Sequence, residues 1–351
     1  MSTFCYLGIY QPTWAHDTVL LKGLEARGAK IILLTDNSPG WRKYWLLWHA
    51  HRHLHEPYDY LLVGYLSNAA VPLARLLARR PVIFNASNSL YEGAVLDRGA
   101  YGPWSPRRYW IWLIDWLAFR LAHLILVESV AQKKFLHHHF GVAERKIAVL
   151  FAGADDAVFH PDPAVPKTDA LTALFRGWLV SATGVEQVLA AAKLLRNEEI
   201  NFLLIGRGPL LAKVRQIIAD DHLTRVKLIT EFLPETELRR QMSSAHVALG
   251  QFSAHPRLER TIQNKTFEAL ALGLPYITRD SPSNRELLTD GENCLFVQPA
   301  NPVDLAAKIL LLKNNPILAT RLAQNARALY EQKLTPRAIA DKFLKILKYQ
   351  S

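Results

Sequence analysis

Cysteine is scarce in this chain of 351 residues, which has only Cys5 and Cys294 and no CxxC pair or zinc-ligand spacing. This excludes a disulfide framework and favours a reducing compartment, so we expect a cytoplasmic protein. Charged residues are also few, at 21%, whereas hydrophobic residues make up 50%. That balance excludes an intrinsically disordered protein and supplies apolar material for two packed cores.

No block of basic residues stands out, although the net charge is +11. The even spread argues against an arm that binds nucleic acid, so no nucleic-acid partner is expected. A diffuse positive field suits nucleotide diphosphates and an anionic membrane surface equally well.

A long uninterrupted hydrophobic run is missing as well. Residues 109–127 come nearest to one, but Asp115, Arg120 and His123 interrupt them, and each is costly at a bilayer centre. The first residues have no positive segment and turn polar at Gln11, so no signal peptide is predicted.

Short apolar runs alternate with helical patterns along nearly the whole chain, which predicts an α/β fold of doubly wound parallel sheets. The predicted strands are 4–10, 30–35, 58–65, 81–87, 123–129, 146–152, 173–179, 202–206, 226–231, 246–252, 276–279 and 294–297. We predict two Rossmann-like domains, 1–160 and 171–334, joined by a proline-containing linker at 161–170. A last helix, 335–351, is expected to pack back on the first domain. Ligands would bind in a cleft between the carboxyl ends of the two sheets.

The most informative local pattern is residues 261–279, TIQNKTFEALALGLPYITR. Lys265 and Glu268 stand three positions apart at the start of an apolar helix. Because a helix N-terminus carries unpaired N–H groups and a positive dipole end, it favours an anion, and a lysine there indicates an anionic ligand. The alternative is a solvated surface lysine beside an ordinary glutamate of the first turn.

This segment resembles the donor-binding motif of the family 4 (group 1) glycosyltransferases, which have the GT-B fold of two facing Rossmann domains. The family carries two glutamates separated by seven residues, and the second opens a helix that ends in a Gly-x-Pro turn. Glu268 matches the second glutamate, whereas the first position holds Arg260, with Glu259 one place earlier. The resemblance implies that Glu268 binds the donor ribose, that Lys265 and nearby amides hold the diphosphate, and that Thr261 lies at the donor. Lys265 and Arg260 are also the catalytic candidates there, since they would stabilise the charge on the leaving phosphate.

Residues 175–186, FRGWLVSATGVE, resemble the first strand and helix start of the family's donor domain. Trp178 and Thr183 stand where the family commonly has an arginine and a lysine that hold phosphate. Arg176 precedes Trp178 by two positions, which keeps it on the same face of a strand, so it is the predicted substitute.

Two further stretches follow the family's order. In 203–209, LLIGRGP, the resemblance places Gly206 and Gly208 beneath the nucleotide. The loop 231–238, EFLPETEL, resembles the one that meets the nucleobase, which makes Phe232 a donor-binding candidate.

The first half of the chain is more divergent. The family's glycine pair after the first strand is replaced by QPTWAHD, and Trp14 is an acceptor-side candidate there. After the fourth strand, Asn85, Glu92 and Asp97 are acceptor-side candidates and Asn88 is a catalytic one. The alternative for each is a polar group that caps a turn.

Two histidine groups, 49–55 and 137–139, are candidates for a metal site. His49 and His53, or His51 and His55, could bind a metal on a helix. No acidic or cysteine ligand has matching spacing, so a solvated helix face is the preferred interpretation. The resemblance also implies no bound metal or cofactor.

Aromatic residues concentrate between 101 and 119, with Tyr109, Trp112 and Trp116 on one helical face. They suit a membrane interface or a lipid-linked acceptor, and equally a core helix packed on the first sheet. Residues 103–108, which include two arginines, are the better candidate for contact with a membrane.

Together these patterns predict a retaining glycosyltransferase that moves a sugar from a UDP- or GDP-sugar to a glycan, a lipid-linked acceptor or another acceptor. We expect it in cell-surface polysaccharide or glycolipid synthesis, in the cytoplasm and at the inner face of the membrane. A nucleotide-sugar epimerase of the same fold and a non-catalytic nucleotide-sugar binding protein remain as alternatives.

Overall fold

The structure, a computed structural model, describes residues 2–350 and divides into two compact units. The first unit combines the chain up to Gly153 with the residues from Leu334 on, and the second is Ala154–Lys333. Residues 1 and 351, which our predicted domains include, lie outside the described residues. The stretch that we predicted as a linker is bonded to the second unit: Lys167 Nζ donates hydrogen bonds to the carbonyls of Ser243 and Ala245, at 2.9 and 2.6 Å.

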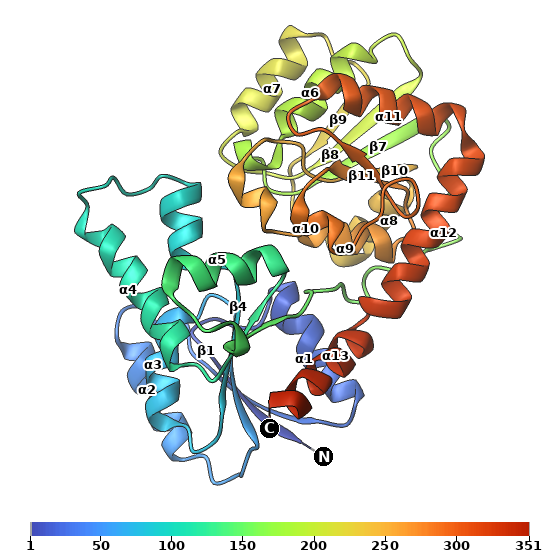
Figure 1. Cartoon of the computed structure of the whole chain (residues 1–351). Coiled ribbons are helices and arrows are strands. Elements are labelled where there is room, and N and C mark those ends of the chain that lie inside the picture. Colours follow the sequence, from blue (N-terminus) through green and yellow to red (C-terminus); the bar gives the residue numbers. More distant parts are fainter. Residues whose placement is uncertain (1, 351) are drawn as a thin grey trace. The chain divides into compact units, whose positions relative to one another are not determined.

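The first unit is built on a six-stranded parallel sheet in the order β2-β1-β3-β4-β5-β6 (Figure 1). Its strands are β1 (Thr3–Gly8), β2 (Lys30–Thr35), β3 (Tyr60–Val63), β4 (Val82–Ser87), β5 (Leu124–Val127) and β6 (Ile147–Val149). Its helices are α1 (Ala15–Ala26), α2 (Arg42–Arg52), α3 (Val71–Leu77), α4 (Pro106–Leu121), α5 (Val130–Phe140) and α13 (Pro336–Gln350). Short 3₁₀ turns η1 (Asn68–Ala70) and η3 (Glu144–Lys146) and a π-helical turn η2 (Glu92–Asp97) complete it.

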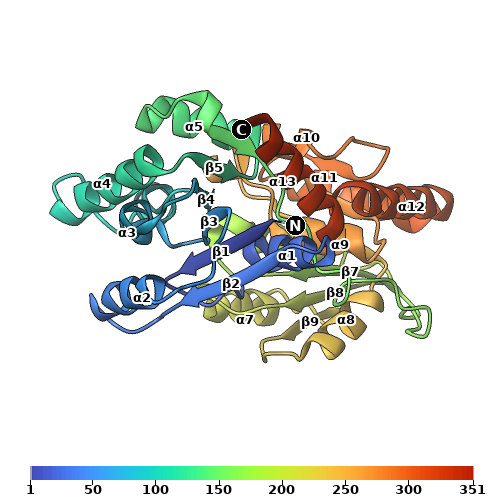
Figure 2. The ribbon, with the colours of Figure 1, turned by 90° about the horizontal axis from the view of Figure 1, so that it is seen from below.

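Helices cover both faces of this sheet, which explains why its strands read as continuous apolar runs. Helices α1 and α13 lie side by side on one face (Figures 1 and 2), and α2, α3, α4 and α5 contribute to the core on the other. Gly23 lets α1 and α13 approach closely, because a Cβ atom there would overlap the Pro336 carbonyl.

The second unit has its own six-stranded parallel sheet, in the order β12-β11-β10-β7-β8-β9. Its strands are β7 (Leu171–Arg176), β8 (Ile200–Ile205), β9 (Val226–Ile229), β10 (Val247–Leu249), β11 (Tyr276–Arg279) and β12 (Leu295–Val297). Its helices are α6 (Val185–Leu194), α7 (Leu211–Asp220), α8 (Glu235–Ser243), α9 (Asn264–Ala271), α10 (Pro282–Arg285), α11 (Pro302–Asn314) and α12 (Pro316–Lys333), with 3₁₀ turns η4 (Ser181–Thr183) and η5 (Pro256–Glu259).

The predicted fold class is confirmed, since every predicted strand is present and both sheets are parallel. Several strands are shorter than predicted. For example, the predicted strand 123–129 is paired only over Leu124–Val127. Glu128 and Ser129 instead leave the ladder at the carboxyl edge, where the Ser129 hydroxyl caps α5.

Each sheet has one point where the strand order reverses, between β1 and β3 in the first unit and between β7 and β10 in the second. Open parallel sheets bind ligands outside the carboxyl ends of the strands at such points. The search for functional groups therefore starts at these two edges.

Within residues 2–350, no helix combines the length and the apolar character that crossing a bilayer requires.

Candidate functional site

The reversal point of the second sheet gathers charged side chains from β7 and α9 beside the backbone that follows β10. Arg176 is the last residue of β7, Gly250 follows β10, and α9 begins at Asn264. Lys265 and Glu268 project from the first two turns of α9, and both are buried, with 8% and 7% of their surface exposed. The alternative of a solvated lysine and glutamate is therefore wrong.

Lys265 lies between the two central strands. Its Nζ donates a hydrogen bond to the Gly250 carbonyl at 3.2 Å and sits 3.7 Å from the centre of the Phe175 ring. Burial, followed by the nearby Arg176 charge, lowers the pKa of Lys265 to about 7, although Glu268 acts in the opposite direction. A bound anion would favour the charged form of the Lys265 amine and so raise its pKa again. The site therefore suits an anionic ligand.

Glu268 accepts a hydrogen bond from the guanidinium of Arg176, and the two form an ion pair. Arg176 thus reaches the same cluster as Lys265 from the neighbouring strand. The geometry brings together three of the residues that the sequence selected for the donor site: Arg176, Lys265 and Glu268.

Glycines form the backbone beside this cluster. A Cβ atom on Gly206 would overlap the Gly177 carbonyl oxygen, and one on Gly208 would come within 2.6 Å of the Leu179 carbonyl oxygen. The loops after β7 and β8 therefore pack backbone against backbone. A Cβ atom on Gly177 would lie 3.2 Å from Lys265 Nζ, so the absence of a side chain there leaves room for the amine.

The loop before α9 is held by a buried arginine that the sequence did not single out. Arg279, 2% exposed at the end of β11, donates hydrogen bonds to the Ser253 carbonyl at 2.9 Å and to the Glu259 carboxylate. Glu259 is thus engaged within the protein. Arg260 follows it, half-buried, and its N–H donates to the Arg257 carbonyl at 3.0 Å.

The other donor-side candidates differ in exposure. Phe232 and Trp178 are 84% and 55% exposed, so both rings are open to a ligand. Thr261 is buried, and its carbonyl accepts a hydrogen bond from Ser283 Oγ at 3.3 Å. Thr183 is buried too, and its hydroxyl donates to the Val180 carbonyl at 2.7 Å, which is a structural use of this side chain.

At the reversal point of the first sheet, the loop after β1 meets the residues that follow β3. The Trp14 ring is 47% exposed and meets the Tyr65 ring edge-on, with centroids 6.0 Å apart. The His16 ring stacks on the same Tyr65 ring, with centroids 4.6 Å apart. Asn85, at β4, donates hydrogen bonds to the His16 carbonyl at 3.0 Å and to Asp17 Oδ1 at 2.8 Å.

This edge contains functional groups that the sequence reasoning missed. His16 Nε2 is paired with the carboxylate of Glu128, which follows β5. Asp17, the next residue after His16, is also buried, and this burial raises its pKa. Hydrogen bonds from Asn85, from the Tyr6 hydroxyl and from a backbone N–H act in the opposite direction. The available signal was position: His16 follows the predicted strand 4–10, and Glu128 is the penultimate residue of the predicted strand 123–129, so both were expected near the carboxyl edge.

The backbone at this edge is strained. Leu66, after β3, and Ser87, at the end of β4, have φ angles of 59° and 54°, in the left-handed region that non-glycine residues rarely adopt. Asn88 follows Ser87, is half-buried, and donates its N–H to the Ala86 carbonyl at 2.5 Å. Strain of this kind is concentrated at binding and catalytic sites, which supports a functional edge here.

Glu92 and Asp97 lie at the two ends of η2. Glu92 is 1% exposed, and its carboxylate accepts a hydrogen bond from Gln132 Nε2 at 2.8 Å. This geometry fits the alternative in which Glu92 stabilises a turn. Asp97 is half-buried at the C-terminal end of η2.

Across residues 2–350, no three His, Cys, Asp or Glu side chains are grouped so as to hold a metal ion. His51 is hydrogen-bonded to the Tyr58 hydroxyl at 2.8 Å, and the His49 and His53 rings lie 4.3 Å apart on α2.

The aromatic side chains of helix α4 and of the residues just before it fall into two groups, one packed on the core and one exposed. Trp112 and Trp116 stack on each other at 6.3 Å and pack against the core of the first unit. Trp104, just before the helix, is 92% exposed, and Tyr109 and Trp110 are 61% and 63% exposed. The core alternative therefore applies to the inward tryptophans, while an aromatic surface remains at the start of the helix.

Comparison with known proteins finds a similarity that is concentrated in the second unit. Residues 170–315 match the family described as Glycosyl transferases group 1. An uncharacterized glycosyltransferase of Methanocaldococcus jannaschii is 29% identical over 156 residues, which are 44% of this chain and 41% of that protein. An alpha-D-kanosaminyltransferase of Streptomyces kanamyceticus is 24% identical over 177 residues, 50% of this chain and 45% of that protein. The chain thus matches less than half the length of these two curated relatives.

The similarity in fold extends over the whole chain. The crystal structure of the Anabaena protein HepE in complex with UDP has a TM-score of 0.73 at 17% identity, covering 99% of this chain and 100% of that one. This agreement confirms the predicted GT-B fold of two Rossmann-like domains.

Proposed function

We propose that this chain, whose residues 170–315 match the family described as Glycosyl transferases group 1, is a retaining glycosyltransferase that uses a nucleotide-diphosphate sugar. The observation that carries the proposal is the buried cluster of Arg176, Lys265 and Glu268 at the reversal point of the second sheet. It places two cations and one carboxylate where open parallel sheets bind nucleotides. Relatives named as glycosyltransferases, and a UDP complex of a protein with a similar fold, support the same proposal.

In this reaction the bond between the anomeric carbon and the diphosphate oxygen breaks. The acceptor hydroxyl oxygen bonds to that carbon from the same side, and its proton passes to the leaving phosphate. Negative charge therefore develops on the diphosphate, and fixed cations there stabilise the transition state more than the ground state. We assign this role to Lys265 and Arg176, with support from Arg260 and the amides at the start of α9.

We assign the remaining donor contacts as follows. Glu268 accepts hydrogen bonds from the ribose hydroxyls, Gly206 and Gly208 let the nucleotide approach the backbone, and Phe232 meets the nucleobase. UDP is the preferred nucleotide, with GDP as the alternative, and no metal is part of the proposal.

The acceptor is proposed to contact the carboxyl edge of the first sheet, where Trp14, Asn85, Asn88 and Asp97 were predicted and where His16 lies. A glycan or lipid-linked acceptor in cell-surface polysaccharide or glycolipid synthesis fits the exposed aromatic residues.

Trp104 and Tyr109 would bring the protein to the inner face of the cytoplasmic membrane. Salt-sensitive binding of the protein to anionic vesicles, weakened by Trp104→Ala, tests that location, and full solubility in their presence at low salt contradicts it.

One experiment separates the proposal from its two rivals. The purified protein is incubated with radiolabelled UDP- and GDP-sugars, with and without a lipid and glycan extract. Label in a new product that requires the extract supports transfer, and an anomeric proton coupling constant identifies retention. A change of the sugar without extract indicates an epimerase, and binding without turnover indicates a binding protein.

A further inference from the structure

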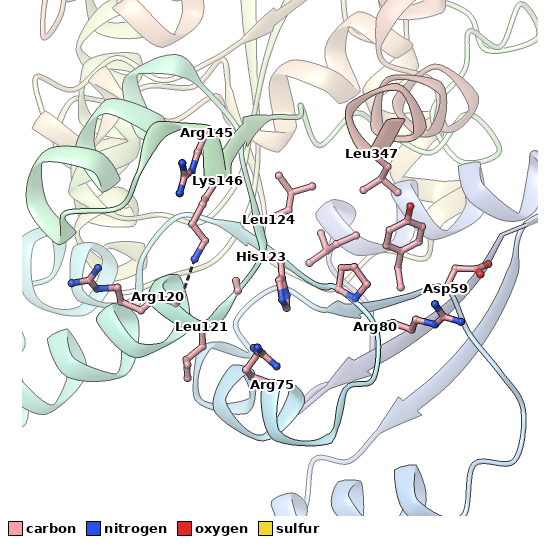
Figure 3. A pocket seen from close by; sticks show the side chains of 14 residues that line it. Asp59, Arg75, Arg80, Arg120, Leu121, His123, Leu124, Arg145, Lys146 and Leu347 are labelled. Carbon is pink, nitrogen blue, oxygen red and sulfur yellow. Dashed lines mark hydrogen bonds between the residues drawn. The ribbon is translucent and has the colours of Figure 1, made fainter. Parts of the chain in front are cut away.

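A large hollow of the first unit lies at the opposite edge of its sheet from His16 and Glu128. It has a volume of about 860 Å³ and is bordered by the amino ends of β3, β4 and β5, by α3 and by Leu347 of α13 (Figure 3). This edge is away from the carboxyl ends where parallel sheets bind their substrates. The proposed transfer reaction therefore gives it no role.

Cations dominate one side of this hollow. Figure 3 shows Arg75, Arg120, Arg145 and Lys146 on that side, whereas Asp59 lies on the other, with Arg80 and Leu347. Asp59 is the only acid of the lining, and its carboxylate already accepts a hydrogen bond from the Thr3 N–H at 2.8 Å.

Three of the arginines have no carboxylate partner. For Arg75, Arg80 and Arg120, no ion pair is present in the part of the chain from residue 2 to residue 350. Arg120 instead lies over the Trp116 ring, with 5.1 Å between its guanidinium carbon and the ring centre. Surface arginines commonly stay solvated. Here Arg75, Arg80 and Arg120 all line one hollow, and Figure 3 shows the Arg120 guanidinium at its outer edge, directed away from its centre.

The cations also act on one another. Burial, followed by the charges of Arg120 and Arg145, lowers the pKa of Lys146, and burial with Arg75 and Lys146 lowers the pKa of His123. Lys146 Nζ donates to the Arg120 carbonyl at 2.8 Å, which stabilises the end of α4. This hydrogen bond gives Lys146 a structural role, whereas Arg75 and Arg80 form no ion pair within residues 2–350.

The rest of the lining is apolar. Ile83, Leu124 and Leu347 are 1%, 3% and 6% exposed and form the inner surface, together with Pro81. His123 Nδ1 accepts the Val82 N–H at 2.9 Å, so its Nε2 carries a proton and is a donor. A ligand with an anionic group and an apolar group would match both parts of the lining.

We propose that this hollow is a second ligand site, separate from the donor site, and that it binds a phosphate ester carrying an apolar group. The planar guanidinium groups of Arg75 and, after rotation of its side chain, of Arg120 match phosphate oxygens, and the apolar floor receives the ester chain. Phosphate of this kind occurs in soluble esters and in lipid headgroups, and the test distinguishes these sources.

The test uses the full chain at physiological ionic strength, where charges more than about 8 Å away are largely screened. Hexyl phosphate is titrated calorimetrically into the wild type and into Arg75→Gln, Arg120→Gln and Arg79→Gln. Arg79 is the matched control, because it is an exposed arginine next to the site whose charge acts on His51. A parallel arm measures flotation with vesicles of phosphatidylcholine containing phosphatidic acid.

We expect saturable binding that weakens about tenfold or more for Arg75→Gln and for Arg120→Gln, as loss of a charge-assisted contact predicts, and that changes little for Arg79→Gln. The same dependence with vesicles identifies the lipid headgroup, and its absence there identifies a soluble ester. Absence of binding in both arms overturns the proposal, and so does an equal loss for Arg79→Gln, which would indicate diffuse attraction. Lys265→Ala should retain this binding, so failure of the donor-site proposal is distinguishable.

Discussion

Arg176 and Glu268, 92 positions apart in the sequence, form an ion pair that joins the end of β7 to helix α9. The Glu268 side chain is 10% exposed and that of Arg176 is 30% exposed, so removal of either leaves a largely buried charge on the other. Such a charge is costly unless water or a ligand reaches it. In the proposed donor complex, a nucleotide would therefore meet a carboxylate that is already oriented and an arginine placed for its phosphates.

Glu268→Ala should weaken binding of UDP, because the ribose loses its hydrogen-bond acceptor, by roughly 1.5–3 kcal/mol. Arg176→Met should weaken it as well, by loss of a cation and of the partner that orients Glu268. Calorimetric titration of both variants and of the double variant measures the coupling energy between Arg176 and Glu268 in UDP binding. We expect it at about 0.5–3 kcal/mol. Strictly additive effects would show that the pair does not act as a unit at the nucleotide.

Lys265→Ala should lower turnover more than it lowers donor affinity, since the developing charge on the diphosphate is largest in the transition state. Loss of one preorganised group of this kind typically costs about 100- to 1000-fold in rate. The measurement compares kcat with the dissociation constant of the donor. Lys213→Ala serves as control, because Lys213 is an exposed lysine of the same unit, paired with Glu186. Equal losses in rate and affinity would place Lys265 at a part of the donor that does not change during the reaction.

The sequence was sufficient for much of the fold and for part of this site. Continuous runs such as LILV indicated parallel strands covered on both faces, and the start of the helix at 264 selected Lys265 and Glu268. Periodicity relates residues up to about four positions apart on a helix and two on a strand. The pairs Arg176–Glu268 and His16–Glu128 span 92 and 112 positions, so they arise from packing that no local spacing encodes.

Gly206→Ala should destabilise the second unit, because the new methyl group would overlap the Gly177 carbonyl oxygen and neither backbone can move freely. Overpacking of this kind costs about 1–3 kcal/mol or more. Thermal unfolding monitors the change, and Gly102→Ala is the matched control, since no atom lies within 4 Å of a Cβ built there. A melting temperature like that of the wild type would mean that the two loops separate readily.

His16→Ala should lower turnover and leave UDP affinity unchanged, because His16 belongs to the first unit and is proposed to face the acceptor. Loss of a group that positions the acceptor typically costs about 100-fold in rate, because small displacements of the reacting atoms slow the reaction. Glu128→Gln retains a hydrogen-bonding side chain and should have a smaller effect in the same direction. Transfer rates and UDP titrations on both variants are the measurements. Weakened UDP binding by His16→Ala would assign this edge to the donor instead.

The affinity for UDP should fall as the pH rises above 7. The pKa of Lys265 is about 7 in the protein without nucleotide, and a bound diphosphate favours the charged amine, so its pKa is higher in the complex. Above pH 7 the free protein holds Lys265 mostly neutral, and binding must take up a proton, which lowers the affinity by up to about tenfold per pH unit until the pKa of the complex is reached.

Calorimetry between about pH 7.5 and 9.5 avoids titration of the phosphate itself, whose pKa is near 6. Titrations in two buffers with different heats of ionisation give the number of protons taken up, which should approach one. Lys265→Met removes the titrating group and should bind UDP more weakly, with a flat pH profile and no buffer dependence. A wild type that shows the same flat profile would mean that Lys265 is already charged before the nucleotide arrives, and the cation at the diphosphate would then be Arg176.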